Sequence, residues 1–134
     1  MSMWIRLLVV IELVIGYGVV FYMWILGVIA LPLVLFTMFL GVGFSALPLV
    51  FAVIFGGFAL WGVMQLVMKI FDPAFNIADI KVIRFYLCLG LSAFAIFIEY
   101  VKFNLSYSFV IFGPPLFVTA HLIYLERRNV LKAS

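Results

Sequence analysis

Two ionisable side chains, Glu12 and His121, lie inside long apolar segments of this chain. An ionisable group in hydrocarbon is costly, so such a group indicates either a functional site or a paired contact. At 1.5 Å of helix rise per residue, Glu12 lies about 9 Å deeper than Arg6, and His121 lies about 9 Å from Arg127. A carboxylate and an imidazole at one depth can form a hydrogen-bonded pair, and histidine exchanges its proton near neutral pH. These two residues are the first candidates for chemistry.

The pair has two interpretations. In the first, which we favour, Glu12 and His121 form a hydrogen bond that fixes the pairing of two helices, or reach back to the nearby interface. In the second, they form a proton-linked site whose protonation drives an activity. The second interpretation predicts that Glu12→Gln and His121→Ala abolish a pH-dependent activity without unfolding the protein.

Other polar residues lie at a similar level. Gln65 and Cys88 each lie about 6 Å inside their apolar segments, counted from Lys69 and Arg84. Four helices would then contribute one polar or polarisable residue each to a polar layer. Helical phase supports only part of this layer, because Gln65 lies opposite the small residues of its segment and can instead face lipid headgroups or a second subunit.

Near the other side of the membrane, Glu99 and Lys102 have the three-residue spacing of a helix-surface ion pair, which is what we expect them to form. The single histidine cannot complete a multi-histidine metal site, and no nucleophile motif, phosphate-binding loop or dinucleotide fingerprint is present. We therefore expect no catalytic residue, no metal and no cofactor, and a protein that is not an enzyme.

The composition indicates that the bilayer is the solvent of this chain. Its 134 residues are 69% hydrophobic and 10% charged, whereas soluble domains are roughly 25% charged. The net charge of +3 does not indicate nucleic acid as a partner, because the basic residues stand singly or in pairs at the ends of apolar segments. Cys88 is the only cysteine, so an internal disulfide is excluded.

These segments predict an all-α integral membrane protein, a single domain that forms a four-transmembrane-helix bundle. No charged residue separates Glu12 from Lys69, and Pro32 and Pro48 mark the turns in this stretch, since proline fits the first turn of a helix. The expected transmembrane helices cover about 4–29, 48–70, 80–103 and 108–126, and a short re-entrant or interfacial helix covers about 32–40. A rival layout has five spans, with a break near 22–27 and an external N-terminus.

Lys and Arg concentrate on the cytoplasmic side of membrane proteins, which orients the predicted bundle. With both termini in the cytoplasm, only Lys102 lies outside. The cytoplasmic cations are then Arg6, Lys69, Lys81, Arg84, Arg127, Arg128 and Lys132. The five-span layout moves Arg6 outside and requires a turn without polar residues, so we prefer four spans in a bacterial inner membrane.

Small residues in stripes predict where the helices pack closely. They are Gly16 in the first helix, Ala52, Gly56 and Ala59 in the second, and Ser92 and Ala95 beside Cys88 in the third. We expect a non-enzymatic membrane protein that acts through helix–helix contacts, as an accessory subunit or an immunity-type protein. Its partners would be the bilayer and another membrane protein or further copies of itself. The alternative is a homo-oligomeric ion channel or proton-coupled transporter that uses Glu12 and His121.

Overall fold

The structure is a computed structural model that describes residues 3–41, 44–72, 74–102 and 104–133. Within these residues the chain forms α1 (Met3–Phe39), the 3-10 turn η1 (Phe44–Ala46), α2 (Leu47–Phe71), α3 (Ile80–Val101) and α4 (Leu105–Ala133). The four α-helices are all long and apolar enough to cross a membrane. The prediction of an all-α chain with four such helices is confirmed.

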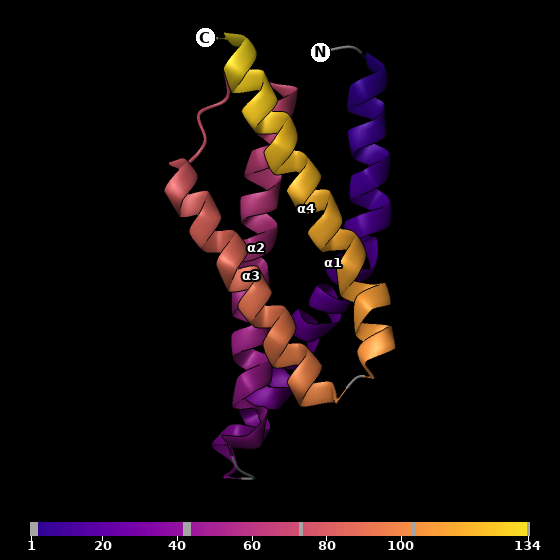
Figure 1. Cartoon of the computed structure of the whole chain (residues 1–134). Coiled ribbons are helices and arrows are strands. Elements are labelled where there is room, and N and C mark those ends of the chain that lie inside the picture. Colours follow the sequence, from indigo (N-terminus) through magenta and orange to yellow (C-terminus); the bar gives the residue numbers. More distant parts are fainter. Residues whose placement is uncertain (1–2, 42–43, 73, 103, 134) are drawn as a thin grey trace.

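The four helices form an elongated bundle around α2, which contacts α1, α3 and α4 (Figure 1). The start of α1, the end of α4 and the connection between α2 and α3 lie at one end of the bundle. The turn between α1 and α2 and the connection between α3 and α4 lie at the other. The first of these ends is called the terminal end below, and the second the turn end.

The first helix is longer than expected. A break was predicted near Leu31, with a separate short helix over 32–40, but α1 continues through Pro32 to Phe39. The proline removes one backbone donor. The apolar residues on both sides exclude water, so the remaining backbone groups keep their helical hydrogen bonds. The turn comes instead at Gly41, whose φ of 78° suits glycine. With 37 residues, α1 is about 55 Å long, against a hydrocarbon core of about 30 Å.

The ends of the other helices follow local sequence signals. Pro48 lies in the first turn of α2, as expected. Asp79 caps α3 by accepting a hydrogen bond from the backbone N–H of Lys81 at 3.4 Å, and Lys102 ends α3 with a left-handed φ of 51°. Beyond the expected span of 108–126, α4 extends in both directions and contains Pro114 and Pro115.

The closest helix pair is α2 with α3. A Cβ placed on Gly90 would lie 2.6 Å from the Ala59 Cβ, and one on Gly62 would lie 3.0 Å from the Tyr86 Cβ. The rings of Phe58 and Tyr86 stack at 5.6 Å between centroids. Glycine at these crossing points allows the two backbones to approach closely, as small residues do in membrane helix pairs.

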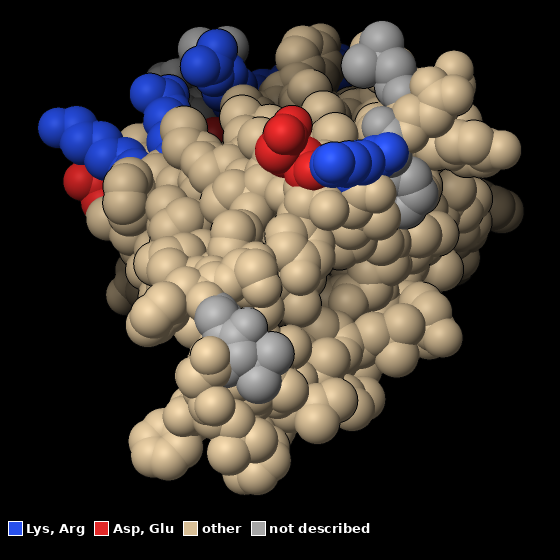
Figure 2. Space-filling view, turned by 90° about the horizontal axis from the view of Figure 1, so that it is seen from below, with Lys and Arg blue, Asp and Glu red and all other residues tan. Residues whose placement is uncertain are grey.

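The outer surface is largely apolar. Many large hydrophobic side chains are exposed on all four helices, including Phe39, Phe109 and Phe117. Viewed from the turn end, the charged side chains lie across the upper part of the visible face, and its lower part shows no Lys, Arg, Asp or Glu (Figure 2). Such a surface has the character expected of a protein surrounded by lipid.

Candidate functional site

The structure brings Glu12 and His121 together. The Nδ1 atom of His121 lies 2.6 Å from the Oε2 atom of Glu12, within hydrogen-bond and ion-pair distance. The two side chains are 29% and 31% exposed, for Glu12 and His121 respectively. An ionised carboxylate can only accept a hydrogen bond, so in its ionised form Glu12 accepts from the Nδ1–H group of His121.

Close packing of α1 on α4 positions this pair. A Cβ placed on Gly16 would lie 2.6 Å from the Val118 Cγ2, so glycine allows the two helices to cross here. Towards the terminal end, the fully buried Val9, two turns from Gly16, and Leu122, one turn from Val118, join Val118 in a cluster that also includes α2 residues. Glu12 lies between Val9 and Gly16 on the same side of α1, which is why it reaches α4.

A second polar contact joins the same helices about one turn deeper. The Thr119 hydroxyl donates to the Pro115 carbonyl at 2.7 Å, and Thr119 also contacts the Tyr17 hydroxyl. Because Thr119 has a single hydroxyl proton, Tyr17 is the donor in this contact. Sequence analysis missed this pair, although a threonine four residues after a proline, with a tyrosine at matching depth in another helix, was a usable signal.

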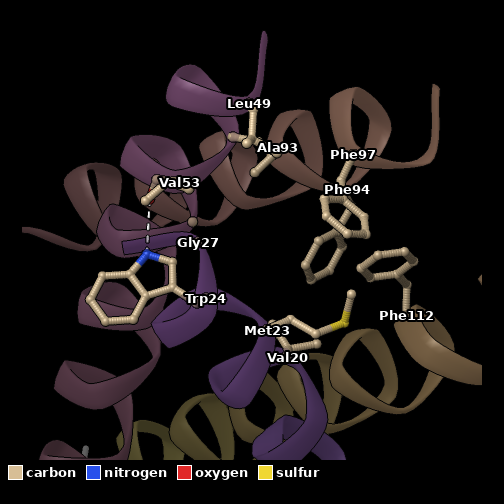
Figure 3. Close-up of a pocket in the computed structure, with 12 residues that line it drawn as sticks. Val20, Met23, Trp24, Gly27, Leu49, Val53, Ala93, Phe94, Phe97 and Phe112 are labelled. Carbon is tan, nitrogen blue, oxygen red and sulfur yellow. Dashed lines mark hydrogen bonds between the residues drawn. The ribbon is translucent and has the colours of Figure 1, made fainter. Parts of the chain in front are cut away.

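A third polar contact joins α1 to α2. The indole N–H of Trp24 donates to the Val53 carbonyl at 2.9 Å (Figure 3). The ring lies on Gly56 and Gly57, where added Cβ atoms would lie 3.2 and 3.3 Å from it. The Trp24 side chain therefore packs within the bundle, between α1 and α2.

The predicted polar layer does not form around the pair. Gln65 uses its Oε1 atom to accept a hydrogen bond from the backbone N–H of Ala78 at 3.1 Å, which ties α2 to the chain that precedes α3. Cys88 is exposed on α3. The physical reason is helical phase: Gln65 and Cys88 lie at a similar depth to Glu12 but project in other directions.

The ion pair that the sequence predicts near the end of α3, between Glu99 and Lys102, does not form. Among the described residues the Glu12–His121 contact is the one ion pair within 4.0 Å, so Glu99 and Lys102 do not form theirs. Lys102 is the left-handed cap of α3, which turns its side chain away from a regular i, i+3 position. Ser92 is exposed and donates to the Cys88 carbonyl at 3.1 Å, and Ala95 is exposed as well.

The small residues of α2 occupy inter-helix positions. Ala52 is buried, Gly56 contacts Trp24 of α1, and Ala59 contacts Gly90 of α3. The predicted stripe therefore serves two neighbours, α1 and α3, and not one. On α3 the close-packing positions are Gly90 and Ala93, one or two residues away from the predicted Ser92 and Ala95.

The chemistry available at the α1–α4 contact is proton binding and hydrogen bonding. No group of three or more His, Cys, Asp or Glu side chains that could hold a metal ion occurs within the described part of the chain. The Glu12 carboxyl group and the His121 imidazole share one hydrogen bond, and both side chains are partly exposed. Comparison with protein-family models, with curated proteins and with solved structures finds no match to this chain.

Proposed function

We propose that this chain is a non-enzymatic membrane protein that acts by docking onto another membrane protein, as an accessory subunit or an immunity-type protein. The observation that supports the proposal is the small part of α1 that packs inside the bundle. Only Val9 and Gly16 of its 37 residues are buried, whereas six residues of the 25-residue α2 are buried. Helix packing is what drives association in lipid, so the remaining surface of α1 is free to associate.

The free face of α1 has the features of a helix-docking surface. It carries exposed apolar side chains such as Ile15, Tyr22 and Ile29. Between them lies Gly18, where an added Cβ would meet nothing within 4 Å. A small residue among large apolar ones lets a second membrane helix approach closely. No charged residue interrupts this surface between Glu12 and Lys69.

The proposal includes an orientation, with both ends of the chain in the cytoplasm of a bacterial cell and the bundle in its inner membrane. The cations of the helices support it, because Lys102 ends α3 at the turn end and the others occupy the terminal end. Those others are Arg6, Lys69, Lys81, Arg84, Arg127, Arg128 and Lys132. The part of α1 beyond Pro32 would then reach the outer interface, the place assigned to the short helix expected from sequence.

Purification in a mild detergent tests the docking proposal. We expect the chain to leave its native membrane in a complex of defined stoichiometry, and to lose the partner when Gly18→Phe blocks close approach on α1. Gly113→Phe on α4 is the matched control, because an added Cβ there also meets nothing within 4 Å. A lone monomer, with no partner recovered after cross-linking in the native membrane, would contradict the proposal.

The second candidate function is a proton-coupled transporter or channel that assembles from several copies. It is favoured by one observation, the 2.6 Å contact between Glu12 and His121 at 29% and 31% exposure. In this function the pair would bind and release the coupled proton. Proteoliposomes should then show a flux that depends on a pH gradient and disappears in Glu12→Gln, and the absence of flux under every ion and pH gradient would exclude it.

A further inference from the structure

An apolar groove lined by residues of all four helices lies between α3 and α4. Within the described residues, α3 packs along α2 and meets α4 chiefly at the rings of Phe94, Phe97 and Phe112. From that contact the two helices diverge towards the terminal end (Figure 1). The floor of the groove consists of the small α2 residues Gly56 and Ala59, which give it depth.

The groove consists of two adjoining apolar pockets that share Val20, Trp24, Gly56 and Phe94 in their linings. The upper pocket is lined by Leu87 and Leu91 of α3 and by Ala120 and Ile123 of α4. The lower pocket is lined by Trp24, Phe97 and Phe112 (Figure 3). Ile123 follows Phe112 by eleven helical positions, which corresponds to a rise of about 16 Å. Half of the hydrocarbon core of a bilayer is about 15 Å thick, so the groove matches the length of an acyl chain in one leaflet.

The groove closes at one end and is charged at the other. Towards the turn end, the rings of Phe94 and Phe112 meet at 4.5 Å between centroids and form its bottom. At the terminal end, Arg84 lies one turn beyond Leu87 on α3, and Arg127 lies one turn beyond Ile123 on α4. Both arginines are exposed, and each stands on the same helical face as the groove residue below it. Glu126 is the neighbouring acid on α4 and is only partly exposed.

We propose that this groove is a binding site for an anionic phospholipid, with one acyl chain between α3 and α4 and the phosphate between Arg84 and Arg127. An acyl chain fits the apolar, laterally open walls, and arginine binds phosphate through paired hydrogen bonds. Basic residues at the mouth of a groove between membrane helices are a known arrangement for anionic lipid headgroups. If a helix of a partner protein occupied the groove, acidic residues of that helix would have to neutralise the two arginines. The phosphate of a lipid neutralises them without a second protein.

Fluorescence quenching of Trp24 tests the site, because this side chain lines both parts of the groove. The full chain carries Trp4→Phe and Trp61→Phe, which leaves Trp24 as the single tryptophan. This variant is reconstituted in phosphatidylcholine nanodiscs that contain a small fraction of a brominated lipid. The brominated lipid is phosphatidylglycerol in one sample and phosphatidylcholine in the other, and both carry the same brominated acyl chain. We expect brominated phosphatidylglycerol to quench Trp24 at severalfold lower mole fraction than brominated phosphatidylcholine.

Charge variants then test the contribution of the lipid headgroup to binding separately from that of the acyl chain. Arg84→Gln and Arg127→Gln should each reduce the preference for phosphatidylglycerol about fivefold, the effect of one basic residue near a membrane surface. Lys102→Gln, at the turn end, is the matched control and should leave the preference unchanged. Inorganic phosphate at constant ionic strength should not relieve the quenching, because the acyl chain supplies part of the affinity.

A groove-filling variant tests the acyl-chain part. Ala120→Phe should weaken quenching by both brominated lipids, whereas Ala95→Phe, on the exposed outer face of α3, should not. Circular dichroism of each variant confirms that it is folded, and the charge variants test the site independently if Ala120→Phe does not fold. Equal quenching by the two lipids, unchanged preference in both arginine variants, or full relief by inorganic phosphate would overturn the proposal. Absence of quenching together with a stable dimer would assign the groove to a second copy and would also overturn it.

Discussion

The Glu12 carboxylate and the His121 imidazole, 109 residues apart in sequence, meet at 2.6 Å and join the first helix to the last. Their contact lies beside the packed Gly16–Val118 crossing. Three features therefore hold α1 on α4: the Glu12–His121 hydrogen bond, a close backbone approach, and the Tyr17–Thr119 contact about one turn deeper. Each can be removed separately.

The Glu12–His121 contact should stabilise the bundle measurably. Hydrogen bonds between membrane helices contribute about 1 kcal/mol, so we expect a coupling energy of that size between Glu12→Gln and His121→Ala in a double-mutant cycle. Reversible unfolding in mixed micelles measures the four free energies of unfolding. Additive effects of the two substitutions would show that the side chains do not interact.

The Gly16–Val118 crossing should not tolerate a methyl group. Gly16→Ala would place a Cβ 2.6 Å from the Val118 Cγ2, and we expect a loss of about 1–3 kcal/mol in the free energy of unfolding. Gly18→Ala, two residues away and open, should be neutral or gain up to about 1 kcal/mol from helix propensity. Equal effects of the two substitutions would contradict the close crossing of α1 and α4.

The α2–α3 interface should not tolerate a methyl group either, because a Cβ on Gly90 would lie 2.6 Å from the Ala59 Cβ, an atom without rotamer freedom. Gly90→Ala should lower the free energy of unfolding by about 1–3 kcal/mol. Adding Ala59→Gly should restore much of the loss by reopening the space. If the double variant is no more stable than Gly90→Ala alone, the predicted contact between these two positions is wrong.

Loss of the Tyr17 hydroxyl should cost about 1 kcal/mol, because Tyr17→Phe leaves the Thr119 oxygen without this donor. Tyr22→Phe, on the exposed face of α1, is the control and should have no measurable effect. Unfolding of the two variants under one set of conditions gives the comparison. A Tyr22→Phe effect as large as that of Tyr17→Phe would rule out a specific contribution from the Thr119 contact.

The proposed orientation predicts opposite accessibility at the two ends of the bundle. In a Cys88→Ser background, Arg127→Cys should react with a membrane-impermeant maleimide only after cells are opened, and Lys102→Cys should react in intact cells. Lys102 and Arg127 are both exposed in the structure, so either side chain can react once the reagent reaches it. Labelling in the reverse order would place the termini outside.

The Glu12–His121 pairing could be predicted from sequence because both helices are flanked by cations that fix depth. The depth of a residue in the membrane does not determine the direction in which its side chain projects from the helix. For this reason Gln65 and Cys88 were predicted to lie in the same polar layer, although their side chains project elsewhere. Gln65 also binds a backbone N–H, a partner that residue types cannot reveal. Matching depth also made the Tyr17–Thr119 contact a candidate, but whether these two side chains meet depends on how α1 crosses α4, which their residue types do not determine.

The end of α1 could not be predicted for a different reason. Pro32 was treated as a helix start, as it would be in water, where a lost hydrogen bond and the ring clash favour a break. In an apolar segment the surrounding residues have no better conformation than helix, so the chain continues to the glycine at Gly41. By contrast, the end of α2 and the start of α3 were predicted well, because polar residues mark them.

Site-specific photocross-linking in the native membrane tests the central claim, that the free face of α1 docks another membrane protein. A benzophenone side chain at Ile29 of α1 and one at Phe117 of α4 give a matched comparison, since these residues are 69% and 75% exposed. We predict one discrete protein adduct from Ile29, which Gly18→Phe removes, and only lipid adducts from Phe117. Lipid adducts alone at both positions, or the same protein adducts from both, would contradict the claim.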